Sequence, residues 1–217
     1  FDYMDFVTKY HENFYFNGNL LDTEINKDDM KLFLQKNESV LKKVTNEHVK
    51  KIKEFSKRYK EEIGLPLWIT GATPSTLTKE KLSLLVDAGL VEMRMGIQTA
   101  AESSKKLYKR PHSNRQVEKA VRMVNDFSHI KAFYDIILDS PWDSDTDSIE
   151  TLMFLSKLPT PFQLSIFSLV FFPGTNLYRR AKEEGIVKDD INDVYRKHYH
   201  EPKKTYLNAL FFLLKDY

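Results

Sequence analysis

The sequence predicts an α/β fold in which about four parallel strands alternate with helices, closed into a barrel or left open. Short apolar runs recur along the chain, and glycine or proline closes each of them. A stretch whose apolar residues have helical spacing follows every run. Such alternation is typical of right-handed βαβ crossovers, which build a parallel sheet. With 217 residues, 41% of them hydrophobic, the chain can form one domain with a sizeable core.

The first elements are helical and are followed by a strand. Residues 1–46 are left as an N-terminal segment without an assigned domain, and the first forty of them are mixed in polarity. Residues from about 27 to 62 are expected to form helix in two pieces, because apolar side chains recur at helical spacing at Val49, Ile52, Phe55 and Tyr59. The run "LPLWITGATP" then predicts a buried strand. Thr78 suits the N-cap of the next helix, and Gly89 suits the left-handed residue beyond its end.

The same strand and helix unit then repeats to residue 185. The expected elements are the strand "VEMRMGIQ", helices at about 101–108 and in "NRQVEKAVRMVNDF", the strand "KAFYDIILDSP", the helix "TDSIETLMFLSKL", the strand "QLSIFSLVFFPGT" and the helix "NLYRRAKEEG". We therefore expect a barrel-like core over residues 47–190 and a C-terminal extension over residues 191–217.

Polar residues at strand ends are the candidate binding residues, because parallel α/β folds bind ligands beyond the C-terminal ends of their strands. Gln98 ends one strand, and Arg110 offers a fixed positive charge shortly after it. Asp135 lies inside the next apolar strand, where an unpaired carboxylate is costly to bury. Together they could hold a zwitterionic ligand. Alternatively, Gln98 caps a neighbouring turn, and Asp135 pairs with a buried lysine or with backbone amides.

Other patterns favour structural interpretations. The stretch "DSDTD", residues 143–147, is like a calcium loop, but Ser148 stands where such a loop needs glycine, so it is interpreted as a helix start. The stretch "HYHE", residues 198–201, has no second histidine-rich segment to complete a metal site, which favours a surface or packing role. No metal ligand is predicted. Three aromatic residues are expected in the core: Phe167, Phe171 and Phe172.

Composition excludes several classes of protein. The 33 basic and 31 acidic residues nearly cancel, so the charge of +2 indicates no nucleic-acid partner. No apolar run approaches the roughly 18 residues of a membrane span, which favours a soluble, cytoplasmic protein. The absence of cysteine excludes disulfides, thiolate metal sites and a cysteine nucleophile. Because the chain starts at Phe1 and not at methionine, we expect a piece of a longer protein.

Four segments stand in a distinctive order: "TPSTLTKEKLSLLVDAGLVEMRMGIQT", "LYKRPHSNRQVEKAV", "YDIILDSPWDSDTDSIETLMFL" and "FSLVFFPGTNLYRRAKEEGIV". In order and spacing they resemble the later two-thirds of the core of radical S-adenosylmethionine (radical SAM) enzymes, over roughly residues 65–187. The resemblance implies a partial TIM-like (βα) barrel with outer helices. Among the branches of the family, the chain looks most like the one that often carries an upstream cobalamin-binding domain.

The resemblance also implies a cofactor site. By position in the family's motifs, Gln98 and Arg110 would hold S-adenosylmethionine (SAM), the arginine through the carboxylate of the cofactor. Asp135 would contact the ribose, and Ile137 would pack against the adenine. The glycine of the "GIQ" segment and two residues of the "PGT" segment complete the expected set: Gly96, Pro173 and Gly174. No catalytic residue is assigned.

The departures from the family's pattern are informative. The CxxxCxxC loop that binds a [4Fe–4S] cluster is missing, so an upstream segment would have to hold the cluster and this chain should be inactive alone. Thr70 and Thr73 stand near a strand end that often bears an acidic group for the amino group of SAM. Asp139 and Asp143 lie where the family commonly has glycine and other residues, so the edge of the pocket is expected to differ.

The resemblance implies reductive cleavage of SAM at the cluster, giving a 5′-deoxyadenosyl radical that abstracts hydrogen from a small-molecule substrate. A cobalamin partner would add methyl transfer. Two alternatives stay open at this stage. The chain could be a degenerate SAM-binding module or partner subunit without chemistry, or it could be an α/β scaffold for another ligand.

Overall fold

The computed structural model describes residues 38–110 and 112–215, with side chains from residue 47 onward. The chain divides into two compact units, Phe1–His48 and Val49–Tyr217, and the second contains the described sheet. Most of the segment that sequence analysis left without a fold, residues 1–37, lies outside the described residues. None of the helices in the described ranges is both long and apolar enough to cross a membrane.

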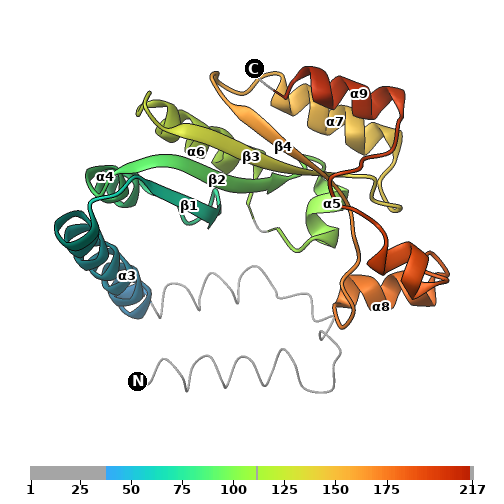
Figure 1. The fold of residues 1–217 in the computed structure, drawn as a ribbon, viewed down its shortest axis with the longest axis horizontal. Helices are drawn as coiled ribbons and strands as arrows, with labels where there is room; N and C mark the ends of the chain where they lie inside the picture. Colours follow the sequence, from blue (N-terminus) through green and yellow to red (C-terminus); the bar gives the residue numbers. More distant parts are fainter. Residues whose placement is uncertain (1–37, 111, 216–217) are drawn as a thin grey trace. The chain divides into compact units, whose positions relative to one another are not determined.

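Strands and helices alternate along the second unit, as the sequence predicts (Figure 1). The strands are β1 (Leu67–Ala72), β2 (Leu90–Gln98), β3 (Lys131–Leu138) and β4 (Gln163–Ser168). The helical elements are α3 (Glu38–Arg58), the π-helical turns η2 (Tyr59–Ile63) and η3 (Ile191–Tyr195), α4 (Lys79–Asp87), α5 (Glu102–Leu107), α6 (Asn114–Asn125), α7 (Asp145–Leu155), α8 (Asn176–Glu183) and α9 (Tyr206–Leu213).

The four strands form one parallel sheet in the order β1-β2-β3-β4. Each crossover therefore moves to the next strand in the same direction, which is the connectivity of a (βα) barrel. The predicted α/β class and the parallel sheet of about four strands are confirmed. Local signals contribute to this order: the Thr78 hydroxyl caps α4 by accepting from the backbone of Lys81, and Gly89 takes the expected positive φ of 104° before β2.

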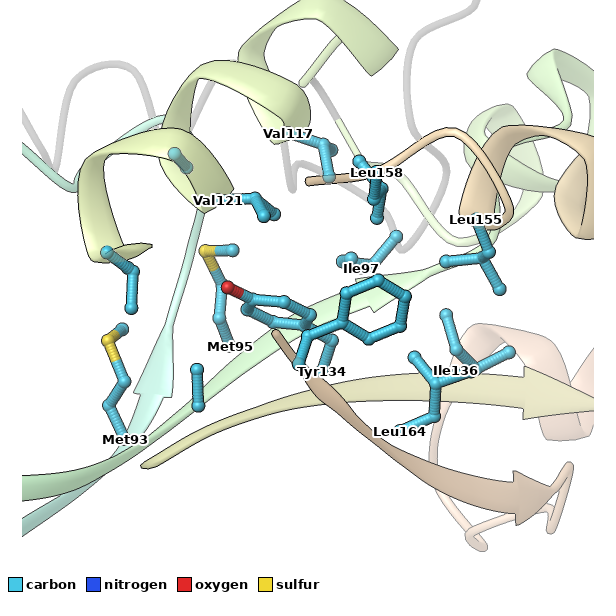
Figure 2. Close-up of a cluster of buried hydrophobic side chains, with 14 of the residues drawn as sticks. Met93, Met95, Ile97, Val117, Val121, Tyr134, Ile136, Leu155, Leu158 and Leu164 are labelled. Carbon is cyan, nitrogen blue, oxygen red and sulfur yellow. The ribbon is translucent and has the colours of Figure 1, made fainter. Parts of the chain in front are cut away.

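One face of the sheet packs against helices and forms the main core. Side chains alternate along β3, so that Ala132, Tyr134, Ile136 and Leu138 are buried while their neighbours are less buried. Figure 2 shows Tyr134 and Ile136 in a cluster with residues of β2, α6, α7 and β4. Its labelled members from these other elements and the segment after α7 are Met93, Met95, Ile97, Val117, Val121, Leu155, Leu158 and Leu164.

The opposite face of the sheet is polar at its centre, and we call it the polar face. It carries Arg94 from β2, Asp135 from β3 and Ser165 from β4, all half-buried. Asp135 pairs in register with Gly96 on one side and with Ser165 on the other. The Arg94 guanidinium lies 5.2 Å from the ring centroid of Phe133. In a closed (βα) barrel this face would line the interior.

The C-terminal extension is part of the same unit. Phe211 of α9 is only 1% exposed and belongs to the main core. The backbone N–H of Leu164 donates to the Lys215 carbonyl over 2.7 Å, and that of Ser168 donates to the Tyr199 carbonyl over 2.7 Å. The C-terminal segment thus satisfies two backbone N–H groups of β4, one near each end of this edge strand.

Some local expectations need correction. Phe172 is 66% exposed and Phe167 is half-buried on the polar face, so of the three phenylalanines assigned to the core only Phe171 is buried. β4 ends at Ser168, before the glycine and proline signal that was expected to close it. The acidic stretch is a helix start, as predicted: Ser144 caps α7 and forms a capping box with Asp147.

Candidate functional site

Gln98 ends β2 in a strained conformation. Its φ is 64°, a left-handed value that is uncommon outside glycine, and its side chain is only 8% exposed. This backbone turns the side chain back over Gly96, because a Cβ added at Gly96 would lie 2.4 Å from Nε2 of Gln98. Oε1 is buried and has no hydrogen-bond partner within the described part of the chain. A buried amide oxygen without a partner is costly, which is typical of binding sites.

Asp135 lies beside this glutamine on the polar face, since Asp135 is the register partner of Gly96. Burial raises the pKa of its carboxyl, while the positive charge of Arg94 and the hydroxyl of Ser165 act in the opposite direction. Oδ1 is buried without a hydrogen-bond partner among the residues that the structure describes. At this oxygen, the buried lysine or backbone amide that the sequence suggested as a partner is therefore absent. Asp135 presents an unused acceptor.

Arg110 follows α5, and the end of that helix positions it. Lys109 takes a left-handed φ of 53°, the Lys109 N–H donates to the Lys106 carbonyl over 3.1 Å, and the Arg110 N–H donates to the Lys105 carbonyl over 2.8 Å. This is the pattern of a Schellman motif, with lysine where glycine is usual. The Nε atom of Arg110 is buried, and none of the described residues accepts a hydrogen bond from it.

His112 connects this segment to the end of β2, and it is not among the site residues that the sequence predicted. The ring is 3% exposed and interacts with the backbone of Ile97. Burial lowers its pKa, and the charges of Arg110 and Lys105 act in the same direction. Because Ile97 precedes Gln98, this contact places Arg110 near the end of the same strand. In the sequence, His112 stands two residues after Arg110, but no local signal separates a buried histidine at this position from one in an exposed turn.

Buried hydroxyl contacts hold the chain where it leaves β2. The Thr151 hydroxyl of α7 lies 3.1 Å from the Thr99 hydroxyl and accepts from the Ala100 N–H over 3.1 Å. Ser104 of α5 donates to Asp143 over 2.8 Å. These contacts join α5 to the start of α7. Asp143 thus accepts a hydrogen bond from a residue of α5. Burial raises the pKa of its carboxyl, while the Ser104 and Ser140 hydroxyls lower it.

A cavity of about 610 Å³ opens at the C-terminal end of β3, between the start of α7 and the C-terminal segment. Ile137, Asp139 and Asp143 line it. Asp139, which has a φ of 63°, accepts from the Lys203 N–H over 2.9 Å and from the Asn208 side chain over 2.8 Å. The edge of the site therefore has carboxylates that bind structural partners. Asp139 anchors the C-terminal segment across the end of β3.

The predicted site residues are not all in one place. Gln98, Asp135 and Gly96 lie together on the polar face, and Ile137 lies two residues beyond Asp135 on the same face. Pro173 and Gly174 are exposed in the turn that precedes α8. Ser165 and Arg94, which act on the charge of Asp135, were not predicted. The alternation of side chains along a strand could have placed both residues on this face. Which residues of the next strand they meet depends on the register in which the strands pair.

Known proteins resemble this chain in structure and not in sequence. No protein-family model matches the sequence, and no curated protein does. Two solved structures of the radical SAM methyltransferase TsrM from Kitasatospora setae match at 18% identity with a TM-score of 0.50. One holds cobalamin and a [4Fe–4S] cluster, and the other holds tryptophan substrate and a SAM analogue. The match covers 63% of this chain and 27% or 26% of TsrM.

Coproporphyrinogen III oxidase (HemN) from Escherichia coli, a radical SAM enzyme, matches at 16% identity with a TM-score of 0.54. That match covers 76% of this chain and 35% of HemN. The chain has a radical SAM-like fold. It spans about a quarter to a third of the length of these proteins, and at this level of identity the likeness concerns the fold.

Proposed function

We propose that this chain is the SAM-binding part of a radical SAM barrel, with the cluster ligands supplied from outside these 217 residues. The observation that carries the proposal is the set of buried polar atoms without partners at Gln98, Arg110 and Asp135. They are the residues that match the family's SAM motifs, and they occur in a chain with that family's fold.

The residues present fit SAM chemically. Arg110 would bind the carboxylate of the cofactor, because a guanidinium can grip a carboxylate with two parallel hydrogen bonds. Asp135 would accept hydrogen bonds from the ribose hydroxyls, and the Gln98 amide beside it would bind a further polar group. Ile137 would contact the adenine. In radical SAM enzymes, SAM beside a reduced cluster supplies hydrogen-atom abstraction, and the protein orients the reactants and excludes water.

The residues present do not fit the cluster itself. Radical SAM clusters are held by cysteine thiolates, and the chain contains no cysteine. The proposal therefore assigns SAM binding to this chain and assigns the cluster to an upstream segment. A cobalamin-binding domain, as in the branch that the sequence resembles, would be another partner. The missing cysteines equally favour a second candidate, a SAM-binding module without chemistry.

Binding of SAM to the 217-residue chain tests the proposal, because all of the residues assigned to the cofactor lie in this chain and the measurement needs no turnover. We expect Arg110→Ala and Asp135→Ala each to weaken binding roughly tenfold to a hundredfold, since hydrogen bonds to charged groups contribute about 1.5–3 kcal/mol. Lys106→Ala is the matched control, because Lys106 is exposed on the neighbouring helix α5. Equilibrium dialysis with labelled SAM measures the three variants.

Equal affinity of Arg110→Ala, Asp135→Ala and the parent chain would show that the residue assignment is wrong. If SAM binds as expected, the sequence encoded upstream of Phe1 separates the two candidates. An upstream segment with a CxxxCxxC motif supports the radical SAM enzyme. An upstream segment without this motif supports the SAM-binding module without chemistry.

A further inference from the structure

Three aromatic side chains gather at the C-terminal end of β4 on the polar face: Phe167, Tyr199 and His200. We call them the aromatic cluster. The Phe167 ring centroid lies 5.8 Å from that of Tyr199 and 5.4 Å from that of His200. The Tyr199 and His200 centroids are 4.1 Å apart. Tyr199 is 52% exposed and His200 is also exposed, so two of the three rings keep open surface.

The segment that carries Tyr199 and His200 is held on both sides. Before His200, the Tyr199 carbonyl accepts from the backbone N–H of Ser168, the last residue of β4. After it, the backbone N–H of Lys203 donates to Asp139 at the end of β3. In Figure 1 the chain that leads to α9 passes the C-terminal ends of β3 and β4. These contacts fix the backbone that carries the two rings, and the rings pack against each other and against Phe167. A preorganised segment lowers the entropic cost of binding.

The aromatic cluster adjoins the proposed SAM site. Phe167 is the register partner of Ile137, and Ser165 is the register partner of Asp135. Neighbouring strands lie about 4.8 Å apart, so the cluster begins one strand beyond the residues assigned to the cofactor. A substrate must lie beside SAM to react with it. These rings occupy a position that a substrate could reach, and aromatic faces favour planar π-systems over saturated groups.

We infer that the aromatic cluster binds a planar aromatic group of the substrate by stacking, next to the SAM site. The position of this subsite beside the cofactor rests on the proposed function. The binding of an aromatic ligand by Tyr199 and His200 does not. Phe167 forms the base of this subsite, because its ring contacts both of the others.

A matched pair of probes tests the inference on the full 217-residue chain: 2-naphthoate and its saturated analogue decahydro-2-naphthoate. They share charge and approximate size, so they differ mainly in the π-system. We expect 2-naphthoate to shift the ring resonances of Tyr199 and His200 in a saturable way, as measured by NMR with labelled aromatic residues. The saturated probe should bind at least about threefold more weakly.

Variants locate the binding. Tyr199→Leu and His200→Leu should each weaken 2-naphthoate binding by about threefold or more, whereas Tyr195→Leu should not, although Tyr195 is an exposed tyrosine in nearby η3. Because both replaced side chains are exposed, the variants should keep the melting temperature of the parent chain. Should one variant fail to fold, the other variant and the resonance shifts of the parent chain decide the result.

The inference is overturned if both probes bind equally, if neither shifts these resonances, or if both leucine variants bind like the parent chain. It is also overturned if Tyr199→Leu weakens SAM binding tenfold, because the rings would then serve the adenine of the cofactor. Binding of 2-naphthoate at the cluster in a chain that does not bind SAM would refute the proposed function and leave the aromatic subsite standing.

Discussion

Asp135 is expected to have opposite effects on stability and on the proposed binding of SAM. Its pKa is raised in the folded chain, mainly by burial, so the protonated form is favoured in the fold. The stability that this provides is present below the unfolded pKa of about 3.8 and is lost as the pH rises through the folded pKa. Compared with a carboxyl of unshifted pKa, the half-buried Asp135 therefore contributes less to stability at neutral pH than at low pH. An acceptor without a partner is retained at the centre of the polar face at the expense of stability.

Replacing this charge should stabilise the chain without ligand. We expect Asp135→Asn to raise the melting temperature at pH 7 by about 2–4 °C, the shift that about 1 kcal/mol causes in a domain of this size. The gain should shrink as the pH falls toward 3.8, because the aspartate of the parent chain is then protonated. Thermal unfolding between pH 4 and pH 8 measures this, with the exposed Glu150→Gln as the control. A gap that widens at low pH would contradict the expected sign.

Gly96 is predicted to matter through Gln98. An added methyl group at Gly96 would meet the end of the Gln98 side chain at 2.4 Å, and this flexible group can move away. We therefore expect Gly96→Ala to cost less than about 1 kcal/mol of stability, and to weaken SAM binding about twofold to tenfold because the amide is displaced.

A double-mutant cycle with Gln98→Ala checks this mechanism. If both changes act through the same amide, the Gly96→Ala, Gln98→Ala double variant should bind SAM no more weakly than Gln98→Ala alone. Additive losses would mean that Gly96 contributes by another route.

At the scale of elements, α7 contacts the turn after β2 and helps to hold the C-terminal end of that strand in place. Thr151 accepts from the Ala100 N–H and donates to the Asp147 carbonyl over 3.0 Å, and both Thr151 and Ala100 are buried. The strained Gln98 lies two residues before Ala100. The position of the helix thus helps to maintain the backbone conformation of a candidate binding residue.

Thr151→Val should weaken this connection while conserving shape. The Ala100 N–H would lose its acceptor inside the core, at a cost of about 1–3 kcal/mol, which corresponds to a fall of roughly 2–12 °C in melting temperature. Thr151→Ser keeps the hydroxyl and should lose much less. Thermal unfolding of the two variants separates the hydroxyl from the methyl group. If the serine variant is the less stable of the two, packing and not the hydrogen bond is responsible.

At the scale of the whole molecule, the fold and the missing thiolates lead to different expectations for two cofactors. The radical SAM-like sheet carries buried polar atoms without partners, which we propose bind SAM, whereas the sequence has no cysteine for a cluster. After anaerobic reconstitution with iron and sulfide, the chain should therefore show no stoichiometric [4Fe–4S] absorbance. Iron and sulfide analysis together with the visible spectrum measures this. A stable cluster at one per chain would require ligands other than thiolates.

The sequence by itself determined the features that depend on local interactions. Periodicity, Thr78, Gly89 and the order of the family's motifs predicted the parallel sheet, with Gln98 at the end of one strand and Asp135 inside the next. Helix caps and strand alternation involve residues close along the chain, so their signals are visible in one sequence.

The tertiary structure alone decided which distant residues meet. Ser165 lies beside Asp135 because β3 and β4 pair in one particular register, and the same register places Phe167 beside Ile137. Tyr199 and His200 reach Phe167 because Asp139 and Ser168 hold a segment that the sequence identified only as an extension. Register and long-range anchoring depend on the packing of the whole core, and a change of one residue in register would move every side chain to the other face. No local pattern in the sequence carries that information.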